Sequence, residues 1–168
     1  RPDFVHPQER RNEVLGILKE GLKDVSFSRA NRSWGIPVPG DPTQVMYVWA
    51  DALVNYITAL GYGNGRKKME FWPAVHLIGK DITRFHSLIW PAMLMAAGLE
   101  PPRRVAVHGH LNIDGRKISK TFGNVIYADD VAKEFGADAL RWYLLADTPY
   151  GPDGAFYRAN FITRFNAD

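Results

Sequence analysis

Three short apolar runs, each of strand length, constrain the fold of this chain more than any other feature. They are residues 45–49 (Val-Met-Tyr-Val-Trp), 75–78 (Val-His-Leu-Ile) and 104–108 (Arg-Val-Ala-Val-His). None alternates strictly between apolar and polar residues, a pattern typical of strands buried on both faces of a parallel sheet. Segments 52–60 and 82–97 between them are helical by composition, so strands alternate with helices through right-handed crossovers. The sequence therefore predicts an α/β fold.

Further elements are predicted around this core. Pro91 is expected to kink or split helix 82–97, and Asp51 to cap helix 52–60. Segment 33–43 carries three Pro and two Gly and predicts an irregular, stiff connection. The remaining helices are predicted at 7–22 (with Val14, Leu15, Leu18 and Leu22 on one face), 129–136, 137–147 and 158–168.

Composition excludes several classes of protein. Because 12% of its 168 residues are aromatic, the chain is not disordered. The sequence contains no run of 18 apolar residues, so it predicts no transmembrane helix. The absence of Cys excludes a disulfide scaffold and a thiolate zinc site. We expect a cytoplasmic location. Because the chain starts at Arg1 and ends within a predicted helix, we also expect it to be a piece of a longer protein.

The predicted strand ends indicate where a ligand binds. In open parallel α/β sheets, ligands bind beyond the carboxyl ends of the strands. Here those ends are 49–51 (Trp-Ala-Asp), 79–81 (Gly-Lys-Asp) and 108–110 (His-Gly-His), and we expect them to meet in one cleft. Segment 103–120 adds five basic side chains against one acid, more positive charge than the net +3 of the whole chain. Such a local cluster indicates an anionic ligand, with a solvated basic turn as the alternative.

The loop 114–124 (DGRKISKTFGN) is the most informative stretch. Lys117 and Lys120 lie three residues apart, with Ser119 between them and glycine on both sides. Ammonium groups on such a loop can neutralise a triphosphate and stabilise charge on departing pyrophosphate. The loop is not a Walker A motif. The alternative structure is a hairpin with exposed lysines.

Residues 117–121 (KISKT) resemble the KMSKS signature of class I aminoacyl-tRNA synthetases, with Ile for Met and Thr for the last Ser. The flanking 108–110 and Gly123-Asn124 follow the order of that family. Further segments resemble those of methionyl-tRNA synthetases in particular. Segment 47–56 is similar to the first methionine-pocket segment of that family. The second pocket segment of the family is similar to residues 76–82, 85–88 and 90–91. The linker that returns from the inserted domain of the family is similar to residues 28–29 and 34–39.

This resemblance implies the second half of a Rossmann-like parallel-sheet nucleotide-binding domain, followed by the start of an α-helical domain. It implies three segments: 1–43, the linker and helix returning from the inserted domain; 44–128, the second half of the catalytic domain with the KMSKS-like loop; and 129–168, the helical connection toward the anticodon-binding domain. The His-x-Gly-His signature of the family belongs to an upstream half. Segment 108–110 is not that motif, because it lacks the spacer.

A methionine pocket is implied by the two similar segments. Aromatic rings suit contacts with a thioether sulfur, and the candidate side chains recur at helical spacing. The alternative is that aromatic residues at this spacing belong to the core. The candidate methionine-binding residues are Trp49, Ala52, Leu53, Tyr56, Asp81, Ile82, Phe85, His86 and Trp90.

An ATP site is implied at the other strand ends and the lysine loop. Lys117 and Lys120 are the candidate catalytic residues, and glycines 79 and 109 would let the backbone approach the nucleotide. Asp81 would hold the substrate ammonium or a ribose hydroxyl. The candidate ATP-binding residues are Gly79, Asp81, His108, Gly109, Leu111, Lys117, Ser119 and Lys120.

The implied reaction is ATP-dependent activation of L-methionine to methionyl-adenylate, then transfer to tRNA(Met). ATP would act with Mg²⁺ and without a metal site in this chain, and no membrane partner is implied. The missing N-terminal half of the catalytic domain would be a partner, so we expect the segment to be inactive alone. Two alternatives stay open: another nucleotidyl-transferring Rossmann-like enzyme, and a non-catalytic module that binds tRNA or a partner chain. Synthetases for Leu, Ile, Val or Cys are a lesser alternative.

Overall fold

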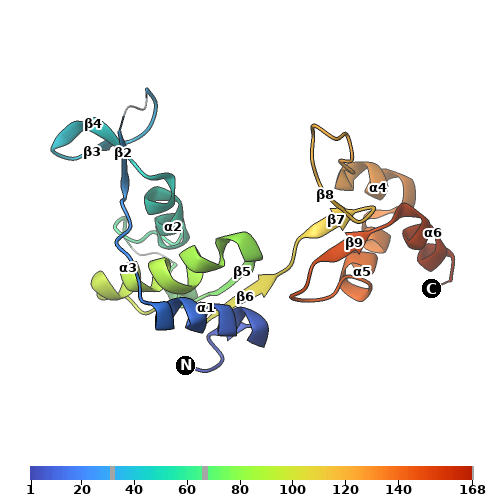
Figure 1. Ribbon diagram of the computed structural model, residues 1–168, viewed down its shortest axis with the longest axis horizontal. Helices are drawn as coiled ribbons and strands as arrows, with labels where there is room; N and C mark the ends of the chain where they lie inside the picture. Colours follow the sequence, from blue (N-terminus) through green and yellow to red (C-terminus); the bar gives the residue numbers. More distant parts are fainter. Residues whose placement is uncertain (31–32, 66–67, 168) are drawn as a thin grey trace. The chain divides into compact units, whose positions relative to one another are not determined.

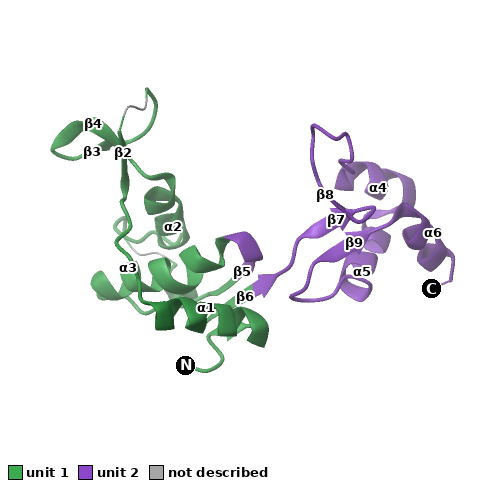
Figure 2. Ribbon diagram, viewed as in Figure 1, with its two compact units in different colours: residues 1–76, 82–106 green, residues 77–81, 107–168 purple. Residues whose placement is uncertain are grey.

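The computed structural model describes residues 1–30, 33–65 and 68–167. Two compact units divide the chain (Figure 2): unit 1 holds 1–76 and 82–106, and unit 2 holds 77–81 and 107–168. Figure 1 traces the helices and strands along the sequence. Within the described residues, no helix is both long and apolar enough to cross a membrane.

A three-stranded sheet with the order β1-β6-β5 contains two of the three predicted strands. Its strands are β1 (Val5–His6), β5 (Val75–Gly79) and β6 (Arg104–His108). β1 runs parallel to β6, with Val5 opposite Val105. The predicted strands 75–78 and 104–108 and the α/β fold are therefore confirmed. The expected burial on both faces is wrong for β5, where Val75 and Leu77 are exposed and His76 and Ile78 are buried. β1 escapes prediction because two residues are too few to show a pattern.

The third predicted strand, 45–49, is wrong, and so is the irregular connection at 33–43. Residues 37–38 and 41–46 instead belong to a small antiparallel sheet, formed by β2 (Ser28–Ala30), β3 (Pro37–Val38) and β4 (Asp41–Met46) in the order β2-β4-β3, and Val48 and Trp49 lie in a helix. Ser28 pairs with Met46, and Gly40 at φ +84° turns β3 into β4. The proline-rich stretch therefore makes a hairpin, with Pro37 on the edge strand β3 and Pro39 in the turn, two positions that tolerate proline.

Helix α2 (Val48–Thr58) begins earlier than predicted. Tyr47 occupies the N-cap position in extended conformation, so Asp51 lies inside the helix and the prediction that it caps the helix is wrong. Segment 49–51 is accordingly a helix start rather than the end of a sheet strand. The apolar run 45–49 misled the prediction because an apolar strand and a buried helix start share composition.

Predicted helix 82–97 forms in three parts. It begins as a 3₁₀ turn, η2 (Lys80–Ile82), widens into a π-helical segment, η3 (Phe85–Ile89), and continues as α3 (Trp90–Ala96). The Trp90 N–H donates to the Phe85 carbonyl five residues back. The change to α geometry falls directly before Pro91, whose missing N–H disfavours an uninterrupted ladder, so the expected split is observed.

At the N-terminus, the predicted helix is confirmed as α1 (Gln8–Glu20). Val14 is buried, whereas Leu15, Leu18 and Leu22 are exposed. A short 3₁₀ helix, η1 (Met69–Phe71), precedes β5.

Unit 2 contains the three helices that were predicted after residue 128. They are α4 (Ala128–Phe135), α5 (Ala137–Ala146) and α6 (Arg158–Ala167). A second sheet was not predicted: β7 (Leu111–Ile113) pairs antiparallel with β8 (Arg116–Lys117) and parallel with β9 (Gly154–Phe156). Its side chains pack with the helices around a core that contains Ile113, Val131, Leu140, Tyr143, Phe156 and Phe161.

Gly109 lies against the backbone of the turn before β9. A Cβ at this position would overlap the carbonyl group of Pro152 and the amide of Asp153. A Cβ on Gly154 would meet only side chains, the closest atom being the Thr148 methyl at 2.5 Å. Backbone cannot give way as a side chain can, so internal packing already requires glycine at 109.

We predict that Gly109→Ala destabilises unit 2 by about 3 kcal/mol or more, the upper range for overpacking. Gly154→Ala, the matched control, should cost less, because the Thr148 side chain can rotate. Urea unfolding followed by the loss of helical circular dichroism measures both. Equal destabilisation by the two variants would contradict the prediction.

Candidate functional site

Six of the eight candidate methionine-binding residues of unit 1 form one packed cluster at α2, η3 and the start of α3: Trp49, Leu53, Tyr56, Phe85, His86 and Trp90. The Trp49 ring stacks on Phe85, with centroids 4.5 Å apart and planes 15° from parallel. Leu53, His86 and Trp90 are almost fully buried, whereas Trp49, Tyr56 and Phe85 remain partly accessible. The sequence placed these residues on two helical faces, and the structure brings those faces together.

Tyr56 and His86 are joined by a hydrogen bond whose direction can be assigned. The His86 Nδ1 atom lies 3.1 Å from the Ile82 carbonyl oxygen, which can only accept, so Nδ1 carries the proton in the neutral ring. Nε2 then accepts from the Tyr56 hydroxyl at 2.8 Å. Burial lowers the pKa of His86 and raises the pKa of Tyr56, so both groups are uncharged at neutral pH.

A second imidazole, His76 on β5, belongs to the same cluster, and the sequence analysis missed it as a site residue. Its ring lies 4.2 Å from the Tyr56 ring and 5.8 Å from the His86 ring, centroid to centroid. Burial, with a smaller contribution from His86, lowers the pKa of His76 to about 4. In the sequence, His76 is one polar residue within an apolar strand, and that was the only available signal.

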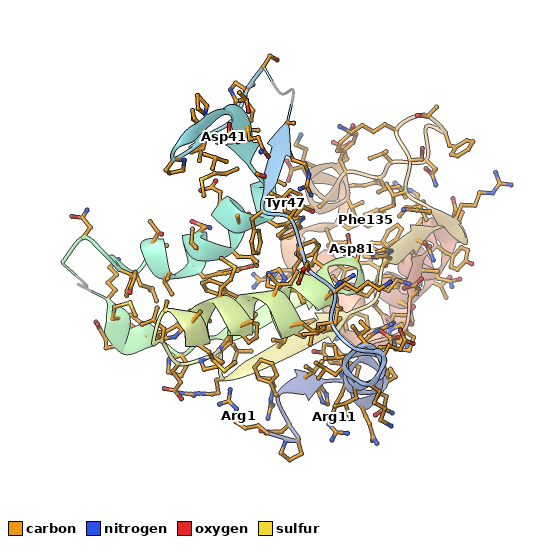
Figure 3. The ribbon with its side chains drawn as sticks, turned by 60° about the vertical axis from the view of Figure 1, so that its left-hand side comes forward. Arg1, Arg11, Asp41, Tyr47, Asp81 and Phe135 are labelled. Atoms are coloured by element: carbon orange, nitrogen blue, oxygen red, sulfur yellow. The ribbon has the colours of Figure 1, made fainter. Side chains whose placement is uncertain are left out.

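Arg29 of β2 supplies a cation at the edge of the cluster. Its guanidinium lies 3.8 Å from the centroid of the Tyr47 ring, in cation–π geometry. Tyr47, labelled in Figure 3, lies in turn 6.3 Å from Phe85. A hollow of about 590 Å³ adjoins these residues and is lined by Arg29, Trp34, Gly35, Ile36, Val45, Met46, Tyr47, Val48 and Asp51.

In unit 2, two of the predicted strand ends meet. The Nε2 atom of His110 lies 3.5 Å from the Asp81 carboxylate, and a Cβ on Gly79 would lie 3.7 Å from the His108 ring. The ends of β5 and β6 are thus adjacent, as expected for neighbouring strands. The first expected strand end, 49–51, is not part of this sheet.

Asp153, which the sequence analysis missed, ties these strand ends to the turn before β9. Its carboxylate accepts from the Lys80 ammonium, with N–O distances of 2.7 and 2.8 Å, and from the His110 backbone N–H at 2.9 Å. The hydrogen bond with Lys80 is the main cause that lowers the pKa of Asp153. The three residues are far apart in sequence, and a Pro-Asp-Gly turn alone does not reveal such a role.

The lysine loop begins as a hairpin. β7 and β8 are connected by Asp114 (φ 48°) and Gly115 (φ 73°), the residue pair that a tight hairpin turn favours. Lys117 and Lys120 are exposed, so the hairpin considered as the alternative is the observed backbone structure. Exposed ammonium groups remain available to an anionic ligand.

Asn124 closes the loop that carries the lysines. Its side-chain carbonyl accepts from the Ser119 N–H at 2.8 Å, and its amide nitrogen donates to the Lys117 carbonyl at 3.1 Å. One side chain therefore joins the two sides of the segment 117–124. In the sequence, Asn124 is recognisable only as the residue after Gly123 at the end of the lysine loop.

The candidate residues fall into two groups according to unit. Asp81 and all the candidate ATP-binding residues lie in unit 2, and the other candidate methionine-binding residues lie in unit 1. In the part of the chain that the structure describes, no three His, Asp or Glu side chains come together as a metal site.

A family model described as "tRNA synthetases class I (M)" matches residues 2–168, so this chain belongs to the class I tRNA synthetases. Within that class it falls among the methionyl-tRNA synthetases. The methionine–tRNA ligase of Mesorhizobium japonicum is 51% identical over 169 residues, which cover 100% of this chain and 33% of that protein. The methionine–tRNA ligase of Thermotoga maritima is 52% identical over 169 residues, which cover 99% of this chain and 27% of that protein.

Solved structures agree with this assignment. Mycobacterium tuberculosis methionyl-tRNA synthetase in complex with methionyl-adenylate superimposes with a TM-score of 0.91 at 46% identity, covering 99% of this chain and 33% of that one. The resemblance stated from the sequence and the expected fold class are thereby confirmed. The chain spans a third or less of the length of these relatives.

We predict that Asn124→Ala loosens the lysine loop. Loss of both hydrogen bonds should raise trypsin cleavage after Lys117 and Lys120 about fivefold or more, since each contributes roughly 1 kcal/mol. Cleavage after Arg141 in helix α5 provides the internal reference, measured by mass spectrometry. Asn112→Ala, which removes an amide from the same hairpin without breaking either bond, is the control. Unchanged cleavage in Asn124→Ala would show that the loop is held by other contacts.

Proposed function

We propose that this chain is the segment of a methionine–tRNA ligase that forms the methionine pocket and carries the cations for ATP. The reaction is attack of the methionine carboxylate on the α-phosphorus of ATP, which gives methionyl-adenylate and pyrophosphate, followed by transfer of methionine to tRNA(Met). The observation that carries this proposal is the joint presence of the aromatic–imidazole cluster and the lysine hairpin. A different nucleotidyl-transferring enzyme would need the second feature but not the first.

Methionine binding is assigned to the cluster and Asp81. The accessible rings of Trp49, Tyr56 and Phe85 offer sulfur–aromatic contacts worth roughly 0.3–1.5 kcal/mol each. Leu53, His86 and Trp90 form the buried floor, with Ala52 and Ile82 beside them. Lowered pKa values keep both imidazoles neutral, so the cluster disfavours a charged side chain and favours an uncharged one.

ATP binding is assigned to unit 2. Lys117 and Lys120 stabilise charge on the β- and γ-phosphates, and Ser119 lies between them on the loop held by Asn124. Gly79, His108, Gly109 and Leu111 contact the nucleotide, and Asp81 binds the ribose hydroxyl or the methionine ammonium. Mg²⁺ arrives with ATP as part of the substrate. No protein nucleophile is needed, so these residues act by positioning and charge stabilisation.

The chain covers a third or less of the length of its relatives, and the resemblance of its segments to that family supports a proposed place in a longer protein. Residues 1–43 return from an inserted domain, 44–128 form the second half of the catalytic domain, and 129–168 lead toward the anticodon-binding domain. The N-terminal half of the catalytic domain and tRNA(Met) are partners. A chain without Cys needs no oxidising compartment, which fits a cytoplasmic enzyme.

Amino-acid-dependent ATP–pyrophosphate exchange by the full-length protein tests the function. Methionine should support exchange, whereas Leu, Ile, Val and Cys should not. Exchange without amino-acid selectivity would favour another nucleotidyl-transferring enzyme. Salt-dependent tRNA binding without any exchange would favour a binding module.

We predict that Lys120→Ala and Trp49→Ala in the full-length protein affect different kinetic constants. Lys120→Ala should lower kcat for exchange by about 30- to 800-fold, as for loss of a transition-state charge stabiliser, with methionine affinity nearly unchanged. Trp49→Ala should raise the methionine KM severalfold and leave the ATP KM unchanged. Thermal melting controls for folding. An unchanged exchange rate in Lys120→Ala would remove the catalytic role from the loop.

We also predict that the 168-residue chain alone does not catalyse methionine-dependent exchange. Positioning ATP requires the other wall of the cleft, which the upstream half supplies in our proposal. Weak ATP binding through the lysines should survive, because attraction to point charges needs little preorganisation. The purified chain is compared with the full-length protein at equal concentration. Exchange proportional to the concentration of the chain would refute the prediction.

A further inference from the structure

His76 is a buried polar side chain of unit 1 to which the proposed function gives no binding role. It lies on the buried face of β5 with only 4% of its surface exposed. Rings from three other elements surround it: Tyr56 from α2, His86 from η3 and Trp72 from the segment before β5. His76 therefore contacts rings from three different elements of the cluster.

One directional contact links His76 to Trp90. The indole Nε1–H of Trp90 donates to the Nε2 atom of His76 at 3.2 Å. Trp90 is only 1% exposed, so water cannot replace this acceptor. Because indole is a donor only, the Nε2 atom of His76 must be unprotonated, and the neutral ring carries its proton on Nδ1. A buried indole that lost this acceptor would keep an unsatisfied N–H, and the free-energy cost of that donor would favour another orientation of the ring.

The electrostatic surroundings maintain that state. His86 faces His76 from η3, and Tyr56, whose own pKa is raised by burial, faces it from α2. Burial and the neighbouring His86 disfavour a second proton on His76, whose pKa is about 4. At neutral pH the imidazole is therefore a constant acceptor for Trp90.

We propose that His76 is a positioning residue of the methionine pocket, an inference that rests on the proposed function. Its Nε2 atom fixes the orientation of the Trp90 ring, and its imidazole ring packs against the Tyr56 ring from the side of β5. His76 contacts three pocket residues, Tyr56, His86 and Trp90, from the strand side. It acts through them rather than by touching the substrate. A purely space-filling role would not depend on which atom of the side chain is an acceptor.

Two amide substitutions separate these roles. The Gln side chain of His76→Gln is long enough to place an acceptor oxygen near the position of Nε2, whereas the Asn of His76→Asn reaches only the position of Nδ1. Ile78→Ala, on the same buried face of β5, controls for loss of strand stability without loss of the acceptor. His76→Leu provides a second acceptor-free variant of adequate bulk, should His76→Asn not fold.

The experiment is ATP–pyrophosphate exchange by the full-length protein, with the methionine KM, ATP KM and kcat measured separately and thermal melting alongside. His76→Asn should raise the methionine KM about tenfold, as expected for an unsatisfied buried donor, and leave the ATP KM within twofold. His76→Gln should restore the methionine KM to within about threefold of wild type. Ile78→Ala should lower Tm with an unchanged methionine KM.

Two results would overturn the inference. Equal methionine KM values for His76→Gln and His76→Asn at similar Tm would remove the acceptor role. A rise of the methionine KM in Ile78→Ala as large as in His76→Asn would reduce His76 to a structural residue. A wild-type protein without methionine-dependent exchange would instead refute the proposed function itself, and the inference with it, so the two failures are distinguishable.

Discussion

Alternate burial along β5 and β6 is the constraint on which the candidate site depends. His76 and Ile78 point inward from β5, while Val75 and Leu77 are exposed, and Val105 and Val107 are fully buried on β6. A shift of one residue would expose the first pair and bury the second, so this register is strongly specified. The register in turn determines where the chain leaves each strand, at Gly79 and at His108. The candidate nucleotide contacts begin at those two points.

The cluster in unit 1 shows how polar groups can be buried at low cost. Three hydrogen bonds join them: Trp90 donates to His76, Tyr56 to His86, and His86 to the carbonyl of Ile82. A buried donor without an acceptor would cost free energy, and a buried imidazolium would cost more. Neutrality and these hydrogen bonds therefore occur together. The same neutrality makes the cluster suited to an uncharged, polarisable side chain.

Unit 2 follows a different principle. Its polar contacts, such as Asp153 with Lys80, are largely open to water, where an ion pair contributes little to stability. Their value lies in geometry: Asp153 connects two strand ends with a turn that lies 73 residues after Lys80 and 43 after His110, and Asn124 joins the two sides of the lysine loop. Lys117 and Lys120 remain exposed on this framework.

The sequence by itself determined the elements whose signal is local. Strands 75–78 and 104–108, the helices after residue 128, the break at Pro91 and the lysine loop each follow from composition and spacing over a few residues. The aromatic residues of α2 and η3 could likewise be recognised from helical spacing. Only the tertiary structure decided that 41–46 pairs with 28–30 in a separate sheet, that Val5–His6 joins β6, and that His76 and Asp153 contact two different groups of candidate site residues. These features depend on partners distant in the sequence, and neither a two-residue strand nor a single buried histidine carries a periodicity that reveals its partner.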